Sequence, residues 1–186
     1  MFLELEKLNR IIRNCKKCEL WKTRTNAVPG EGPQDARIMF VGMAPGRTED
    51  IEGRPFVGPA GKFLNKLLES TGIKRSEVFL TSPLKCFPPR NRKPLPKEIE
   101  ACKPYLLKQI EIIRPQIIIL LGEVALETLL KRKDVSNVRG KPIEKDGIIY
   151  FPTYHPAAGM RFPKIREKLL NDFMKLKKII QKLQLS

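Results

Sequence analysis

The stretch Ile117-Ile118-Ile119-Leu120-Leu121, followed by Gly122, is the longest continuous apolar run in the chain. Such a run favours a short strand that is buried on both faces, as strands are in parallel sheets. It is far shorter than the roughly 20 apolar residues of a membrane-spanning helix. Glu4, Glu6 and Lys7 also interrupt the apolar residues at the N-terminus. The sequence therefore predicts a buried strand, no targeting or membrane segment, and a cytoplasmic location.

Strand and helix patterns alternate on both sides of this run. Strands are predicted at residues 37–42, 78–80, 116–121 and 148–151, and helices at residues 3–12, 63–72, 97–113, 123–132 and 163–183. This alternation predicts a three-layer α/β domain with a mainly parallel sheet. With 186 residues, 41% of them hydrophobic, we expect a single domain over residues 1–186 that buries its own core.

The charge of the chain is strongly unbalanced. Its 36 Lys and Arg residues against 20 Asp and Glu give a net charge of +16, and the basic residues run through the whole sequence. A heat-adapted surface is one explanation, but such surfaces usually balance both signs in ion-pair networks. The excess therefore predicts a polyanionic partner such as DNA.

The four cysteines, Cys15, Cys18, Cys86 and Cys102, form a close CxxC pair and two partners from the middle of the chain. A reducing cytosol favours metal binding over two disulfides, although the cytosol of hyperthermophiles is an exception. Four thiolates suit either a zinc ion or an iron–sulfur cluster. The residues alone therefore predict a metal centre and leave its identity open.

Ligands of parallel sheets bind beyond the C-terminal ends of the strands, where this sequence places loops 42–61, 81–97 and 153–163. The glycines of the first loop allow a ligand to approach the backbone, and Phe56 offers a flat face to a base. The loop does not match a phosphate-binding motif, because Gly58 is followed by Pro59 where that motif has lysine. The alternative is a tight loop whose phenylalanine packs on the core.

His155 is the only histidine of the chain. Proline at position 156 biases it toward extended backbone, so it is expected at the end of the last strand, where ligands bind. A lone histidine is often structural, but its side chain titrates near neutrality and suits acid–base or hydrogen-bonding work. We therefore predict a functional role for it.

Taken together, these motifs resemble the family 4 uracil-DNA glycosylases, the iron–sulfur members of the uracil-DNA glycosylase superfamily found in thermophilic bacteria and archaea. The resemblance covers nearly the whole chain. It rests on CxxC at 15–18, Gly-x-Ala-Pro-Gly at 42–46, Gly-Arg-Pro-Phe-Val-Gly at 53–58, Lys-Cys-x-Pro-Pro at 85–89, Cys102, and Tyr-His-Pro-Ala-Ala at 154–158. Six motifs in order are far more specific than any one of them.

The resemblance implies an α/β/α sandwich around a four-stranded, mainly parallel sheet, and a [4Fe–4S] cluster held by the four cysteines. It implies that Gly42, Met43 and Ala44 contact the uracil through the backbone, and that Phe56 stacks on the flipped base. Glu49 matches an acidic position of the first loop. His155 matches the histidine that hydrogen-bonds the uracil oxygen as negative charge accumulates there. We take His155 and Glu49 as the catalytic candidates.

Two departures from the family pattern affect the base site. Met43 stands where the family usually has glutamate, and Ser82 stands where an asparagine reads the Watson–Crick edge of uracil. An amide donates and accepts at once, whereas one hydroxyl is shorter and fixes one bond at a time. Ser82 therefore leaves open a broader base choice, or an iron–sulfur DNA-binding relative without glycosylase activity.

The DNA contacts are expected from two further segments. Arg90, Arg92 and Lys93 lie in a proline-rich basic loop between the third and fourth cysteines, which suits phosphate binding. The alternative is a solvated connection. Met160 and Arg161, in a loop at 157–162, are candidate wedges into the duplex. We predict a monomeric DNA repair enzyme that removes uracil from single- or double-stranded DNA and leaves an abasic site.

Overall fold

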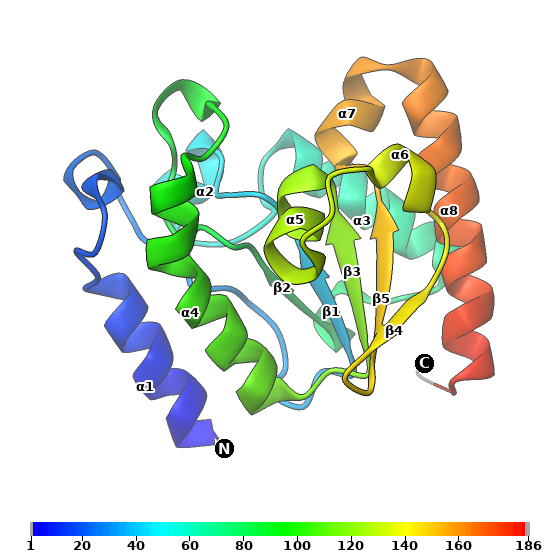
Figure 1. The fold of residues 1–186 in the computed structure, drawn as a ribbon, viewed down its shortest axis with the longest axis horizontal. Helices are drawn as coiled ribbons and strands as arrows, with labels where there is room; N and C mark the ends of the chain where they lie inside the picture. The colour runs from blue at the N-terminus through cyan, green and yellow to red at the C-terminus, as the bar shows by residue number, and fades with distance from the viewer. Residues whose placement is uncertain (1, 185–186) are drawn as a thin grey trace.

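The computed structural model describes residues 2–184 and contains one five-stranded sheet with helices on both faces (Figure 1). The strands are β1 Ile38–Val41, β2 Val78–Thr81, β3 Ile117–Leu121, β4 Ile143–Lys145 and β5 Ile148–Thr153. Their order is β2-β1-β3-β5-β4, and the first four are parallel. The predicted α/β class with a mainly parallel sheet is therefore confirmed.

The expected count of four strands was wrong by one, because β4 pairs antiparallel with β5 at the edge of the sheet. The pattern misses β4 because its three residues are partly or fully exposed and carry no apolar run. Asp146 and Gly147 join the two strands and both have positive φ, 53° and 75°. An Asp-Gly pair with this geometry is typical of a tight hairpin turn.

The apolar run at residues 117–121 is the central strand β3, which lies between β1 and β5 and is buried along its whole length. Ile118 and Leu120 face one core, built mainly with α1 Phe2–Arg13, α4 Pro96–Ile113 and α5 Glu123–Leu130. Ile117, Ile119 and Leu121 face the other core, built with α3 Pro59–Thr71 and α8 Pro163–Lys182. Two cores on opposite faces of one sheet make the three layers.

Shorter helices shape the edge of the sheet where the parallel strands end. They are α2 Arg47–Glu52, α6 Val135–Val138 and α7 Pro156–Arg161, with 3₁₀ turns at Glu19–Lys22 and Pro89–Asn91. A further 3₁₀ turn, Arg75–Glu77, directly precedes the start of β2. The segment 157–162 was expected to be a loop, but most of it belongs to α7. Pro156 takes the first position of that helix, where a missing N–H costs nothing. The candidate wedge residues therefore stand on a short helix.

The three candidate functional loops leave the sheet at the same edge, since β1, β2 and β5 run parallel. In Figure 1 this edge lies at the top, beside α2, α5 and α7. Among residues 2–184, no helix combines the length and the apolar character needed to cross a membrane.

Candidate functional site

A cleft of about 550 Å³ opens at this edge of the sheet. All three predicted loops contribute to it. Its walls are Val28, Met43, Ala44, Pro45, Gly46, Glu49, Pro55, Phe56, Ala60, Ser82, Asn91, His155, Ala157, Ala158, Arg161 and Phe162. The structure thus brings together seven of the residues proposed from the sequence, which are separated by up to about 120 positions along the chain. The cleft is large enough for one extruded nucleotide.

Phe56 and His155 form the aromatic part of the cleft. Their rings are 6.2 Å apart between centroids and inclined by 25°, in a stacked arrangement. Gly42 leaves room for the phenylalanine, because a Cβ at position 42 would lie 2.6 Å from the tip of the Phe56 ring. Phe56 itself has φ of 51°, in the left-handed region that bulky residues rarely adopt. Its surroundings must therefore hold the ring in place.

His155 ends the extended segment after β5 and caps α7, as its sequence position predicts. Its Nδ1 accepts a hydrogen bond from the Ala157 N–H at 3.2 Å. Burial lowers the pKa of His155 to about 4, against a smaller opposing effect of the Glu49 carboxylate. The imidazole is therefore neutral at pH 7, and because Nδ1 accepts, the proton resides on Nε2. A neutral histidine with a free Nε2–H is a hydrogen-bond donor.

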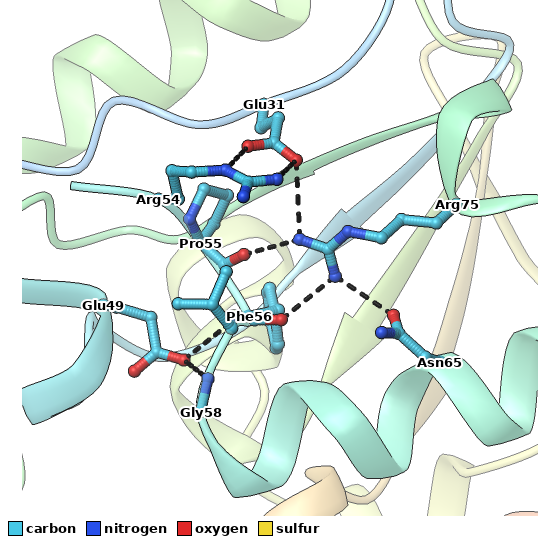
Figure 2. A network of polar contacts seen from close by, with 9 residues as sticks. Glu31, Glu49, Arg54, Pro55, Phe56, Gly58, Asn65 and Arg75 are labelled. Carbon is cyan, nitrogen blue, oxygen red and sulfur yellow. Dashed lines mark hydrogen bonds and ion pairs between the residues drawn. The ribbon is translucent and has the colours of Figure 1, made fainter. Parts of the chain in front are cut away.

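Glu49 joins the two halves of the first loop. Its Oε2 accepts the Gly46 N–H at 3.1 Å. Its Oε1 accepts the N–H groups of Val57 and Gly58 at 3.0 and 2.8 Å, as Figure 2 shows beside Phe56. A carboxylate with three backbone donors holds the backbone in one conformation. Glu49 lines the cleft, but its hydrogen bonds are those of a residue that fixes the loop.

The backbone around Met43 offers further donors. The Gly42 N–H donates to the Thr81 carbonyl at 2.9 Å, which ties this loop to β2. The N–H groups of Met43 and Ala44 have no hydrogen-bond acceptor among residues 2–184. Unpaired backbone donors in a cleft are suited to an oxygen acceptor of a ligand.

Ser82 lies in the cleft but is turned toward its own segment. Its side chain is buried, and its Oγ donates to the Leu84 carbonyl at 2.5 Å. Asn91, which the sequence analysis did not select, lines the same cleft. Its exposed side chain makes no hydrogen bond within the described part of the chain. A carboxamide is therefore present in the cleft, from the loop between the third and fourth cysteines.

The four cysteines also meet in space, as predicted. They line one cavity together with Ile12, Lys17, Trp21, Arg24, Lys85, Ala101 and Tyr105. Three of the sulfurs accept hydrogen bonds: Cys86 from Arg24 Nη1 at 3.1 Å, Cys102 from the Lys85 N–H at 3.3 Å, and Cys15 from the Lys17 N–H at 3.5 Å. Donors of this kind stabilise the thiolate form that binds metals. Burial alone acts the other way and raises the pKa of Cys102 to about 12.

The proposed DNA-contacting residues divide into two groups. Arg92 is bound to the buried carboxylate of Glu98 at 2.6 Å, and Lys93 lies 3.5 Å from Glu123. Arg90 is exposed and has no ion pair or side-chain hydrogen bond among residues 2–184. The second group lies on and just after α7. Met160 is 42% exposed and Phe162 is 50% exposed, and Arg161 lines the cleft. Phe162, which also lines the cleft, was not predicted as a site residue. The only signal for it in the sequence is its position two residues after Met160.

A family model described as "Uracil DNA glycosylase superfamily" matches residues 29–184 of the chain. The chain belongs to this superfamily. It is 51% identical over 179 residues to a type-4 uracil-DNA glycosylase of Saccharolobus solfataricus, covering 91% of this chain and 83% of that protein. Type-4 enzymes of Archaeoglobus fulgidus and Thermotoga maritima are each 44% identical, with 95% of their length covered. The resemblance to the type-4 family seen in the sequence is thereby confirmed.

Proposed function

We propose that this chain is a DNA repair glycosylase that flips uracil out of DNA and hydrolyses its N-glycosidic bond. The observation that carries the proposal is the pairing of Phe56 with a neutral His155 in a cleft at the C-terminal edge of the sheet. The type-4 relatives, at 44–51% identity, carry the same activity in their names. The product is an abasic site and free uracil.

Cleavage of the bond leaves positive charge on the sugar and negative charge on the departing base. His155 Nε2–H donates to a carbonyl oxygen of the uracil, where that negative charge accumulates. The unpaired N–H groups of Met43 and Ala44 supply further donors from the floor of the cleft. Preorganised donors of this kind stabilise a developing anion without reorganisation. Water then adds to C1′ of the sugar, and the uracil anion takes up a proton.

Base flipping requires a stacking surface for the base and a replacement for it in the duplex. Phe56 provides the stacking surface, and the exposed apolar side chains of Met160 and Phe162 fill the gap in the duplex. Arg161, which lines the cleft, and the exposed Arg90, which precedes the cleft residue Asn91, attract the phosphates. Both single- and double-stranded DNA can present an extruded uracil to this cleft. The free-energy cost of extrusion is lower where the base is unpaired.

The base edge is read differently from the family pattern. With its hydroxyl proton committed to Leu84, Ser82 offers only an acceptor to a ligand. We infer that Asn91 supplies the carboxamide that contacts the extruded nucleotide, since its side chain has no partner within residues 2–184. The competing function, DNA binding without base release, follows if neither residue can hold uracil in place.

The cysteine cavity fits a [4Fe–4S] cluster held by Cys15, Cys18, Cys86 and Cys102. The four thiols line one cavity, and four cysteine thiolates are the usual ligand set of a [4Fe–4S] cluster. The resemblance to the type-4 family favours this cluster over a zinc ion, which four thiolates would also suit. When bound, the cluster supplies a structural cross-link between the N-terminal segment and the loop after β2.

The activity is tested with a single-uracil oligonucleotide and the purified, cluster-loaded protein. Alkaline cleavage of the product strand and detection of free uracil should show one abasic site for each uracil. An oligonucleotide with thymine at the same position is the control. Absence of release at any temperature, while the protein binds the oligonucleotide, would establish the competing function.

A further inference from the structure

Arg75, outside the cleft, contacts the backbone beneath Phe56. It comes from the 3₁₀ turn Arg75–Glu77, just before β2. Its Nη2 donates to the Pro55 carbonyl at 2.7 Å, and its Nη1 donates to the Phe56 carbonyl at 3.0 Å (Figure 2). Arg75 is not one of the residues that line the cleft. It therefore acts on the site only through the backbone of this turn.

The turn needs such support because of its conformation. A bulky residue in the left-handed region costs about 1–2 kcal/mol relative to ordinary backbone. Phe56 is in that region, with φ of 51°. Glu49 fixes the two N–H groups after Phe56, and Arg75 fixes the two carbonyls up to and including it. The polar groups of the turn are thus held from both sides.

Arg75 is itself held rigidly. Its Nη1 also donates to Asn65 Oδ1 at 3.1 Å, and Glu31 lies 3.6 Å from its Nη2. Glu31 is occupied in turn by Arg54, at 2.6 and 3.0 Å. Figure 2 shows the two arginines on either side of the same carboxylate. Arg75 also binds the Phe56 turn, whereas within residues 2–184 the side-chain hydrogen bonds of Arg54 go to Glu31.

The space around the turn is equally restricted. A Cβ at position 61 would overlap the Phe56 carbonyl oxygen, and Gly42 lies against the tip of the ring. His155 lies near the ring, with 6.2 Å between the ring centroids. A ring confined in this way can accept a base without losing further freedom, which preserves binding energy.

We propose that Arg75 is a positioning residue for base release, which holds Phe56 in its stacking orientation by binding the carbonyls of residues 55 and 56. The proposal rests on the proposed function, because it assigns Phe56 the flipped uracil as its ligand. The planar guanidinium can bind two carbonyls and the Asn65 side chain at once. Lysine keeps the charge but cannot reproduce that fork.

The test compares Arg75→Met, Arg75→Lys and the matched control Arg54→Met, which removes the other arginine of the same carboxylate. Single-turnover uracil release is measured with enzyme in excess. We expect a loss of about tenfold or more for Arg75→Met, a smaller loss for Arg75→Lys, and a change within about twofold for Arg54→Met. Equal losses for Arg54→Met and Arg75→Met, or wild-type release by Arg75→Met, would overturn the proposal.

Two further measurements separate positioning from general destabilisation. In a Phe56→Ala background, Arg75→Met should cost no more than about twofold, because coupled residues are not additive. Inhibition by free uracil should weaken in Arg75→Met, while binding of an abasic-site oligonucleotide stays within about twofold of wild type. Additive losses, or weaker abasic-site binding with unchanged uracil inhibition, would refute the role.

If Arg75→Met does not fold, Asn65→Ala gives the same test, since it removes one partner of the guanidinium and leaves Arg75 in place. It should lower uracil release and weaken uracil inhibition, and wild-type values for both would refute the proposal. Uracil release by the wild-type protein tests the proposed function separately. If the wild type releases none, the function and this inference both fail.

Discussion

The cysteine cavity and the base cleft lie on the same molecule but are built in opposite ways. The cavity is lined by four cysteines and seven other residues, and the four thiols carry its chemistry. The cleft is made mostly of small and apolar residues, and its chemistry comes from backbone geometry and from the environment of one histidine. A thiol site can therefore be predicted from side-chain identity, whereas a base site depends on conformation.

The two regions share one segment of chain. The Lys85 N–H donates to the Cys102 sulfur, while its buried Nζ donates to the Ser82 carbonyl at 2.8 Å and to Gln109 Oε1 at 2.7 Å. Desolvation lowers the pKa of Lys85 to about 7. Residues 82–86 thus link the cleft to the cavity. A change at the cavity should affect overall stability, and a change in the cleft should affect the rate of base release.

The largest effect is expected at the cavity. Cys102→Ser removes a buried member of the proposed ligand set and should lower the thermal unfolding midpoint by about 10 °C or more, because each lost kcal/mol costs roughly 2–4 °C in a chain of this size. Iron and sulfide content, measured on the same sample, should fall with it. The control is Thr128→Ser, at a buried position that lines neither the cavity nor the cleft. It should keep the wild-type unfolding midpoint and the wild-type iron and sulfide content. Unchanged iron content in Cys102→Ser would remove this cysteine from the ligand set.

His155→Ala should have the largest effect on the cleft alone. Loss of one donor to a developing anion typically costs about 10²–10³ in rate. Single-turnover release should fall by that factor, while affinity for the uracil oligonucleotide changes within about twofold. A parallel fall in affinity and rate would mean that the side chain serves binding instead of the transition state.

Glu49→Gln distinguishes a catalytic carboxylate from one that fixes the loop. The amide keeps the shape and one acceptor oxygen but loses the charge that binds three N–H groups. We expect a loss of about 1–2 kcal/mol in unfolding free energy and a rate loss of about tenfold. The shape of the pH–rate profile should not change. Disappearance of an ionisation from that profile would instead make Glu49 a catalytic base.

The pH dependence follows from His155. Burial lowers its pKa to about 4 from 6.5, so the neutral donor persists down to about pH 5 and release should fall only toward pH 4. Between these two pKa values the unfolded chain binds the proton more tightly. The contribution of His155 to stability is therefore present above about pH 6.5 and is lost as the pH falls to 4. His155→Gln should lack that slope in urea unfolding, and an identical slope would contradict the lowered pKa.

The smallest effect is expected on the basic loop. Arg90→Ala should weaken oligonucleotide binding and reduce the slope of log K against log salt by about one, as for the loss of a single phosphate contact. Arg92→Ala is the matched control: it breaks the pair with buried Glu98 and should lower stability more than the salt slope. The reverse pattern would assign the phosphate contact to Arg92.

The sequence predicted most of the architecture and the parts of the site that depend on residue type. The apolar run at 117–121 placed the central strand, and the four cysteines, predicted to act together, line one cavity. The prediction failed at β4, where three exposed residues leave no apolar pattern. It also failed at α7, where a proline followed by alanines forms a helix in a segment expected to be a loop.

By itself the sequence determined the fold class, the set of thiols and the position of the only histidine, because these follow from hydrophobic periodicity and from side-chain chemistry. Tertiary structure alone decided the neutral state of His155, since desolvation depends on what surrounds it. It also decided that Ser82 donates its hydroxyl proton to Leu84, that Asn91 lines the cleft, and that Arg75 binds the backbone carbonyl of Phe56. These depend on contacts between segments far apart in the chain, which no local pattern encodes.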